Sequence, residues 1–322
     1  MPAVPGGVTP PIGTLPGGVT PPIAVLPPGQ QAANASVDLE FSTNAPLTPG
    51  RRFAQSPEWN VWVDSNIVDT TDHRYGLDVS SRSGHLTIGA DQRVRDEMVA
   101  GLNVIFERNR SNGFGGEMQA KSDGVSIGPY IAYRLAPEWT VDGSFSIGWL
   151  DNDNNIAGLT GSSSTTRYSL SFDATGDYPF GNARIYPKAL VSYSHFRNGA
   201  YDLSGLVGTT PVALTVTENS FNYGLLELSS QASWTFRTSG GKLLVPYAEL
   251  GVRYEFERPN DGQILTGDLK FATPSPWSGL ARLGGRVLIS RSMFVEASVG
   301  YLSFLQQGLD SWEGRLFLSF AF

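Results

Sequence analysis

Residues 139–149, WTVDGSFSIGW, alternate between apolar and polar or small side chains. One set of positions has tryptophan at both ends with Phe145 and Ile147 between them, whereas the other includes Thr140 and Asp142. Successive side chains of a β-strand point to opposite faces, so this period of two predicts a strand with an apolar face and a polar face. Globular strands are mostly about 5–6 residues long, so a strand of this length is unusual for a soluble protein.

The same alternation recurs along the chain from Pro57 to Phe322 and predicts twelve strands. The expected strands cover residues 58–68, 84–94, 97–108, 123–135, 138–150, 164–178, 184–197, 221–237, 242–257, 276–290, 293–305 and 311–322. The longer connections are expected at 69–83, 109–122, 151–163, 198–220 and 258–275, after odd-numbered strands. The turns after even-numbered strands are tight, so long connections collect at one end of the sheet and short turns at the other.

A closed transmembrane barrel explains these features together. Lipid offers no hydrogen-bond partners to the backbone, so a spanning sheet must close on itself. Each spanning strand needs about 9–11 tilted residues, with its apolar face toward lipid, aromatic residues at both interfaces and its polar face toward the lumen. We therefore predict an all-β fold over residues 57–322, a twelve-stranded antiparallel transmembrane β-barrel with short periplasmic turns.

Strand parity also predicts which charged side chains point into the lumen. In residues 244–256, for example, the apolar positions alternate with Glu249, Arg253 and Glu255. One interpretation is structural pairing that keeps the lumen hydrated, and the other is contact with a chain segment inside the pore. The lumen-facing charges are expected to be Lys188, Glu249, Arg253, Arg282, Arg286, Glu296, Glu313 and Arg315.

The N-terminal part of the chain has a different composition. The octapeptide PGGVTPPI occurs at 5–12 and again at 16–23. Proline and glycine at this density lack backbone donors and apolar bulk, so residues 1–30 are expected to form a disordered, extended spacer. Residues 31–56 are expected to form a linker and are a candidate, by their position, to thread the lumen. A short helix could run from Gln30 to Phe41, and Pro46 and Pro49 would stop it.

Composition excludes several classes of function. The chain has no cysteine, which excludes a disulfide scaffold, a thiol nucleophile and a Cys-based zinc site. A net charge of −7 without a basic stripe argues against a nucleic-acid partner. No nucleotide-binding or zinc-protease motif is present, so we expect no cofactor, no metal and no catalytic residues. Net charge and the absence of a long apolar run would suit a cytoplasmic protein, but the strand alternation argues against that location.

Two local patterns resemble parts of a catalytic site or a metal site. Ser194 and His195 are adjacent at the outer rim of an expected strand, where a hydrolase could place a nucleophile and its base. Adjacent strand residues point to opposite faces, so these two side chains should not meet. Residues 151–155, DNDNN, resemble the start of a calcium loop, but the sixth and twelfth positions are Ile156 and Ser162. A solvated external loop is the preferred interpretation, with weak calcium binding as the alternative.

The C-terminal residues carry a family resemblance. The chain ends on Phe322, and the alternate positions before it are apolar (Leu316, Leu318 and Phe320), which resembles the assembly signal of outer-membrane proteins. Twelve strands behind a low-complexity linker resemble an autotransporter β-domain, the translocator of type V secretion in Gram-negative bacteria. The motifs WNVW at 59–62, GHLTIGADQ at 84–92 and the run 125–133 are similar to early strands of that family.

The resemblance implies a function and partners. An autotransporter β-domain anchors its upstream passenger in the outer membrane and helps it to cross, with the linker retained in the lumen. The implied partners are outer-membrane lipid, the barrel-assembly machinery and the chain's own passenger, and we expect a monomeric barrel. Residues 1–5, MPAVP, do not resemble a signal peptide. The expectation is therefore a fragment of a longer precursor, a truncated open reading frame or an excised piece of one. The alternatives are a stand-alone pore or transporter and, from another class, an outer-membrane hydrolase.

Overall fold

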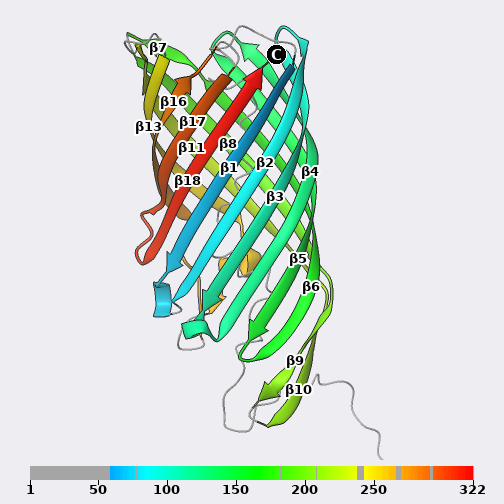
Figure 1. The fold of residues 1–322 in the computed structure, drawn as a ribbon. Helices are drawn as coiled ribbons and strands as arrows, with labels where there is room; N and C mark the ends of the chain where they lie inside the picture. Colours follow the sequence, from blue (N-terminus) through cyan, green and yellow to red (C-terminus); the bar gives the residue numbers. More distant parts are fainter. Residues whose placement is uncertain are drawn as a thin grey trace, which may run out of the picture.

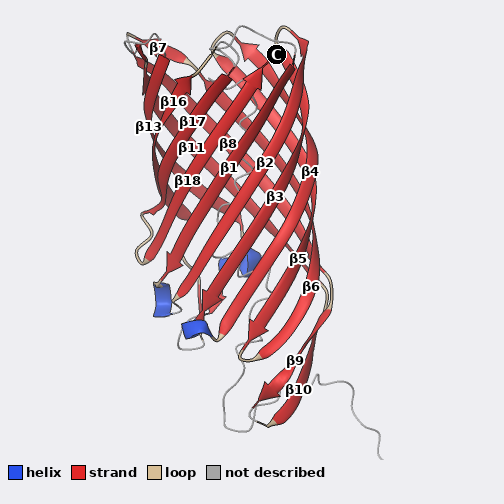
Figure 2. Ribbon diagram, viewed as in Figure 1, coloured by secondary structure: helices blue, strands red, loops and turns tan. Residues whose placement is uncertain are grey.

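The computed structural model describes residues 59–76, 78–181, 183–207, 209–237, 243–265, 270–290 and 293–321. The expected spacer at 1–30 and the expected linker at 31–56 lie outside these described residues. The described part of the chain is almost entirely β-structure (Figure 2). None of its helices is long and apolar enough to cross a membrane.

Twelve long antiparallel strands form a closed barrel, which confirms the predicted fold (Figure 1). Each strand pairs with the next one in this series, and β18 pairs with β1 to close the wall. The closing pair is in register over its length, from Asn60 opposite Ala321 to Asp72 opposite Leu309. The strands are β1 (Trp59–Asp72), β2 (Val79–Arg95), β3 (Met98–Gly113), β4 (Met118–Ala136), β5 (Trp139–Ile156), β6 (Leu159–Gly176), β8 (Ala183–Asn198), β11 (Asn219–Trp234), β13 (Leu243–Glu257), β16 (Trp277–Leu288), β17 (Met293–Phe304) and β18 (Leu309–Ala321).

Short elements occupy the connections. β7 (Tyr178–Phe180) and β12 (Phe236–Arg237) lie at the end of the barrel that holds the C-terminus. At the opposite end lie the hairpin of β9 (Tyr201–Val207) and β10 (Thr210–Val216), and the small sheet of β14 (Ile264–Leu265) and β15 (Phe271–Ala272). The 3-10 helices η2 (Arg74–Gly76), η3 (Phe114–Gly116) and η4 (Pro259–Gly262) also follow odd-numbered strands of the series (Figure 2).

Three of the five expected long connections were wrong because most of their residues extend the barrel strands, and a fourth, 198–220, is mostly strand because it contains the β9–β10 hairpin. The predicted loops at 69–83, 109–122 and 151–163 are mostly strand, and the fifth and sixth barrel strands meet in a two-residue turn at Ala157 and Gly158 with positive φ. Residues 151–155 therefore belong to a strand rather than to a solvated loop. Their polar composition is compatible with a wall because Asn152 and Asn154 point inward and are buried. The amide of Asn152, for instance, donates to Oγ1 of Thr165 at 2.8 Å.

Burial is inverted relative to a soluble protein. On β5 the polar residues Thr140, Asp142 and Ser146 are buried, whereas Phe145 and Trp149 are exposed. The ten residue steps from Trp139 to Trp149 cover roughly 34 Å along the strand. At a tilt of about 45° this length spans roughly 24 Å, close to the ~25 Å apolar band of outer-membrane barrels. The apolar outer face therefore has the height of a lipid bilayer core.

One inward-facing apolar cluster lies near the C-terminal end of the barrel. It consists of Trp62, Val99, Tyr130, Ala132 and Phe317. Phe317 interrupts the alternation of its strand because it points inward and stacks on Trp62, with ring centroids 6.0 Å apart. A Cβ on Gly89 would meet the Trp62 ring at 2.3 Å, so only glycine lets this ring lie against the wall.

Candidate functional site

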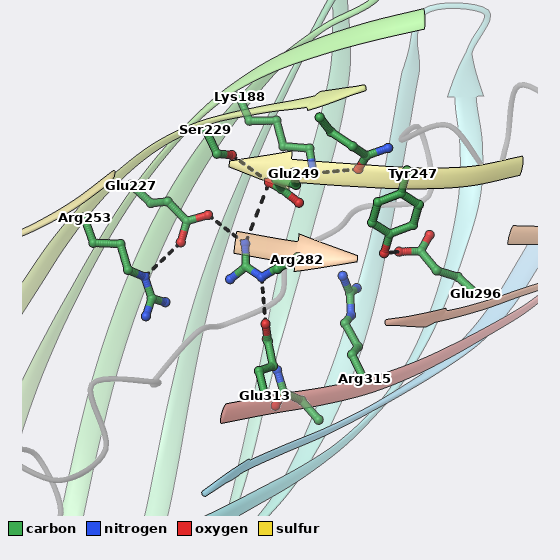
Figure 3. Close-up of polar contacts among 12 residues, drawn as sticks. Lys188, Glu227, Ser229, Tyr247, Glu249, Arg253, Arg282, Glu296, Glu313 and Arg315 are labelled. Atoms are coloured by element: carbon green, nitrogen blue, oxygen red, sulfur yellow. Dashed lines mark hydrogen bonds and ion pairs between the residues drawn. The ribbon is translucent and has the colours of Figure 1, made fainter. Parts of the chain in front are cut away.

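Charged side chains gather on one half of the inner wall, formed by β8, β11, β13, β16, β17, β18 and β1 (Figure 3). All eight sequence-predicted lumen charges lie on this half, and ion pairs or hydrogen bonds link them to one another or to nearby carboxylates. We call this set the charge network. Its cations are Lys188, Arg253, Arg282, Arg286 and Arg315, and its carboxylates are Asp64, Glu227, Glu249, Glu296 and Glu313.

Arg282 is the centre of the charge network. Its Nη1 lies 3.0 Å from Oε1 of Glu227 and 3.7 Å from Oε1 of Glu249, and its Nε donates to Oε2 of Glu313 at 2.6 Å. Three carboxylates from three different strands thus share one guanidinium. Nζ of Lys188 reaches Glu249 from the other side at 3.2 Å, and Arg253 bonds Glu227 at 3.0 Å.

Two further ion pairs continue the charge network toward the C-terminal end. Nε of Arg286 donates to Oε2 of Glu296 at 2.6 Å, and the hydroxyl of Tyr247 donates to Oε1 of the same carboxylate at 2.8 Å. Arg315 forms a bidentate ion pair with Asp64 across the closing strand pair, with Nε and Nη2 each 2.9 Å from a carboxylate oxygen. Bidentate pairs of this kind have a fixed geometry, which arginine provides and lysine does not.

The sequence prediction missed Asp64 and Glu227. Both could have been found from the alternation of faces. Asp64 is on the face opposite to the apolar Val63 and Ile67. Glu227 is on the same face as the polar Ser229 and Gln231. The inward-facing Trp62 and Leu225 obscured the signal, since each places an apolar residue on the polar face.

A separate buried ion pair lies on the opposite half of the inner wall. Arg167 on β6 donates from Nη1 to Oε2 of Glu107 on β3 at 2.9 Å, and from Nη2 to Ser126 at 2.8 Å. Both charged side chains are about 1% exposed, so bulk water cannot solvate either charge if its partner is removed. Elsewhere this half is lined mainly by serine, asparagine and glycine, among them Ser146, Ser169 and Asn103. The lumen therefore has one wall that carries the charge network and one wall on which small polar residues surround the Arg167–Glu107 pair and the buried carboxylates of Asp91 and Asp142.

The described residues of the connection 258–276, which are 258–265 and 270–276, lie at the end of the barrel opposite the C-terminus. Pro259, Gly262 and Ile264 of this connection are buried and line a cavity together with Arg253, Glu255 and Leu302 of the barrel wall. Two hydrogen bonds from Nε2 of Gln306, to the carbonyls of Ser275 and Trp277, tie the connection to the loop before β18.

Comparison with known proteins identifies this architecture. Residues 61–300 match the autotransporter β-domain, which is well over half of the chain. The chain belongs to the autotransporter β-domain family. It is an outer-membrane translocator domain, and anchoring of a passenger is the function of the family. No curated protein matches the sequence.

Solved autotransporter barrels share the fold. The translocator domain of NalP from Neisseria meningitidis superposes with a TM-score of 0.66 at 16% identity, covering 91% of this chain and 94% of that one. The β-domain of Bordetella BrkA gives 0.64 at 18% identity, covering 82% and 100%. The transport unit of AIDA-I from Escherichia coli gives 0.57 at 11% identity, covering 92% and 97%.

Membership of the translocator family indicates which end of the barrel faces the periplasm. Short turns of outer-membrane barrels lie in the periplasm, so the end that holds the C-terminus is periplasmic and the connection 258–276 is external. In the C-terminal strand of the translocator, Leu316 and Phe320 are exposed toward lipid and Leu318 is half-buried. Phe322, the last residue of the expected assembly signal, lies outside the described residues.

The hydrolase candidates of the translocator point to opposite faces. Ser194 is buried in the lumen and hydrogen-bonds Ser169 at 2.8 Å, whereas His195 faces outward and bonds Asn222 on the neighbouring strand at 2.8 Å. A serine and a histidine on opposite faces of one strand cannot act as nucleophile and base. Among the described residues, no three histidine or carboxylate side chains are grouped to hold a metal ion.

Proposed function

We propose that the lumen of this translocator holds the chain's own linker, residues 31–56, so that the spacer at 1–30 and any passenger before it stand outside the cell. The main observation that supports this proposal is the position of Trp59. This residue begins β1 at the periplasmic end, opposite Gln92 and one residue before Asn60, which pairs with Ala321 of the C-terminal strand. A chain that precedes Trp59 starts in the periplasm, and the closed wall leaves the lumen as its route to the surface.

The length of the linker supports the proposal. Fourteen residues of β1 extend over roughly 48 Å, which at a tilt of about 45° corresponds to a height of roughly 34 Å. As a helix, the 26 residues of the linker would be about 39 Å long. The linker is therefore long enough to traverse the barrel from end to end.

The chemistry of the lumen supports it as well. The charge network joins five cations to five carboxylates, so the network itself carries no excess of one sign that would repel a chain with both signs. The linker has Asp38 and Glu40 in its first half and Arg51 and Arg52 in its second half. Small hydroxyl and amide side chains on the opposite wall provide donors and acceptors without filling the space.

We also propose how the domain is recognised during assembly, that it is a monomer and that it is not an enzyme. The barrel-assembly machinery reads the C-terminal strand through Leu316, Leu318, Phe320 and Phe322, because an exposed edge strand can pair with a partner strand. The folded domain works as a monomer in outer-membrane lipid, since its wall is closed by its own strands. The domain has no catalytic activity of its own, and the charge network serves the wall and the linker.

A cysteine-accessibility experiment tests the linker. The chain has no cysteine, so single replacements report on one position each. The full chain, preceded by a signal peptide, is produced with either Ala3→Cys or Val37→Cys and labelled in intact cells with a maleimide carrying a polyethylene glycol chain too bulky for the lumen. We expect labelling at position 3 and protection at position 37, which is lost after heating in SDS. Equal labelling of both positions in cells with folded barrels would contradict the proposal.

A further inference from the structure

Three cationic side chains stand side by side on the outer surface of the barrel. Arg82 on β2, Arg110 on β3 and Lys121 on β4 are all exposed or half-exposed. Register places Arg82 directly opposite Arg110, and Arg110 directly opposite Lys121. We call these three residues the basic row.

Like charges directly opposite each other on a sheet destabilise it. Acidic neighbours reduce the charge repulsion at the two ends of the basic row. Arg82 donates to Asp69 at 2.6 Å, and Nζ of Lys121 lies 2.9 Å from a carboxylate oxygen of Asp123. Asp123 is shared with a fourth cation, Arg108. Arg110, the middle residue, forms no ion pair within the described part of the chain. The basic row therefore has unused capacity for an anion at its centre.

Apolar residues lie two same-face steps below the basic row, beyond the step that holds Gly84, Arg108 and Asp123. Two same-face steps toward the periplasm on the same strands are Leu86, Phe106 and Val125, which are 40%, 48% and 38% exposed and belong to the outer apolar band. Four residues along a strand cover roughly 14 Å, which is roughly 10 Å of depth at a tilt of 45°. Arginine and lysine have long side chains that keep their charge in the polar zone while the stems follow apolar surface. Val125 is opposite Trp149, so these apolar residues mark the external edge of the apolar band, and the basic row lies roughly 10 Å beyond that edge, in the head-group zone.

We propose that the basic row binds a phosphate group of an outer-leaflet lipid whose acyl chains lie against Leu86, Phe106 and Val125. The guanidinium groups of Arg82 and Arg110 can each donate two parallel hydrogen bonds to phosphate, and the ammonium of Lys121 adds a point charge. The carboxylates of Asp151 and Asp153 follow on β5, opposite Asp123 and Lys121, and limit the site to the surface of β2, β3 and β4. The inference rests on the outer-membrane location and not on the lumen linker, so each can fail without the other.

Native mass spectrometry of the refolded full chain in detergent tests this site. The probe is bisphosphorylated lipid A, compared with the same lipid after removal of both phosphates and with inorganic phosphate as competitor. The triple variant Arg82→Gln, Arg110→Gln, Lys121→Gln removes the basic row. Near a membrane surface each basic residue contributes on the order of 1 kcal/mol, so three correspond to on the order of 100-fold in affinity.

A matched control variant removes the same charge from the opposite end. Arg95→Gln, Arg134→Gln and Arg237→Gln alter three exposed arginines near the periplasmic turns. We expect bound lipid A in the original protein and in this control, and loss of about two decades of affinity in the basic-row variant, with heat-modifiable migration showing that all three are folded. Equal binding by all proteins, or binding that survives dephosphorylation of the lipid, would overturn the inference. Displacement by inorganic phosphate would also overturn it, since it would show a free-phosphate site without lipid.

Discussion

Nε of Arg282 donates a 2.6 Å hydrogen bond to Oε2 of Glu313, although the two residues are on strands separated by a third. Register places Gly300 of β17 directly between them. Neighbouring strands are about 4.8 Å apart, so the bond must pass over the intervening backbone. A Cβ on Gly300 would lie 3.0 Å from Cγ of Arg282 and 3.0 Å from Oε2 of Glu313. The missing side chain leaves the path for the ion pair open.

Replacing Gly300 with alanine should therefore separate Arg282 from Glu313 while retaining both charges. We expect a loss of about 1–3 kcal/mol in the free energy of unfolding, as for other overpacked sites. The control is Gly314→Ala on the adjacent strand, where an added Cβ meets nothing within 4 Å. Denaturant titrations of both refolded variants give their unfolding midpoints. Equal midpoints would show that the open path over Gly300 does not contribute to the stability of the barrel.

Removing the central guanidinium should have a larger effect. Arg282→Gln leaves the buried carboxylates of Glu227 and Glu313 without their shared partner, and breaking a buried ion pair on one side costs about 3–5 kcal/mol. Arg197→Gln is the matched control, because Arg197 and Glu218 are about 70% exposed and such surface pairs contribute about 0–1 kcal/mol. Unfolding curves that shift equally for both variants would argue that the charge network does not stabilise the barrel.

The outer surface should tolerate charge at its rim but not at its middle. Leu250 is 68% exposed halfway along its strand, and an arginine there should destabilise the barrel in lipid by about 2–4 kcal/mol. Val94 is 53% exposed beside the periplasmic turn, and Val94→Arg should cost about 0–1 kcal/mol. Refolding into lipid vesicles measures both changes. A larger penalty at position 94 would contradict the membrane placement.

The external turn after the first strand should respond to pH. Nδ1 of His73 lies 2.7 Å from a carboxylate oxygen of Asp78, and this hydrogen bond raises the pKa of His73 above its ordinary value of about 6.5. A raised folded-state pKa stabilises the turn at pH values below the ordinary pKa, and the contribution is lost as pH rises through the raised value. NMR titration of the His73 ring measures the pKa directly.

The variant Asp78→Asn should lower the pKa of His73 toward its ordinary value. Asparagine is suitable because residue 78 has a φ of 45°, a conformation that asparagine tolerates. Asp153→Asn, an exposed carboxylate of another hairpin, serves as the control and should leave the titration of His73 unchanged. An unchanged pKa in the Asp78 variant would exclude the hydrogen bond as the cause.

Deletion of Phe322 tests the assembly signal. We expect the shortened chain, exported with a signal peptide, to lose most of its heat-modifiable form in the outer membrane, because recognition of the last strand would be impaired. The same protein refolded from denaturant in detergent should remain folded, since its strands and closing pair are retained. Normal assembly of the shortened chain in cells would refute a role for the terminal residue.

Strand number, strand order and the two faces of each strand could be predicted from the sequence, because the side-chain period of two is a local property of the backbone. The alternation in 139–149 was enough to separate a lipid face from a lumen face. The external ends of the strands could not be predicted. Residues 151–155 look like a loop by composition, but they are strand because they pair with residues 119–123 and 160–164 of the neighbouring strands, and Asn152 also contacts Thr165. That pairing depends on partners that local sequence does not reveal.

The sequence by itself determined the fold class, the family and the side of the wall on which the eight predicted lumen charges lie. Only the tertiary structure decided which charges meet. Arg282 reaches Glu313 over Gly300, and Arg167 reaches Glu107 over Gly124 and Gly148, because the register aligns a glycine on each strand that lies between the partners. The physical reason is that parity is set residue by residue along one strand, whereas pairing across a barrel depends on the stagger of all the strands between.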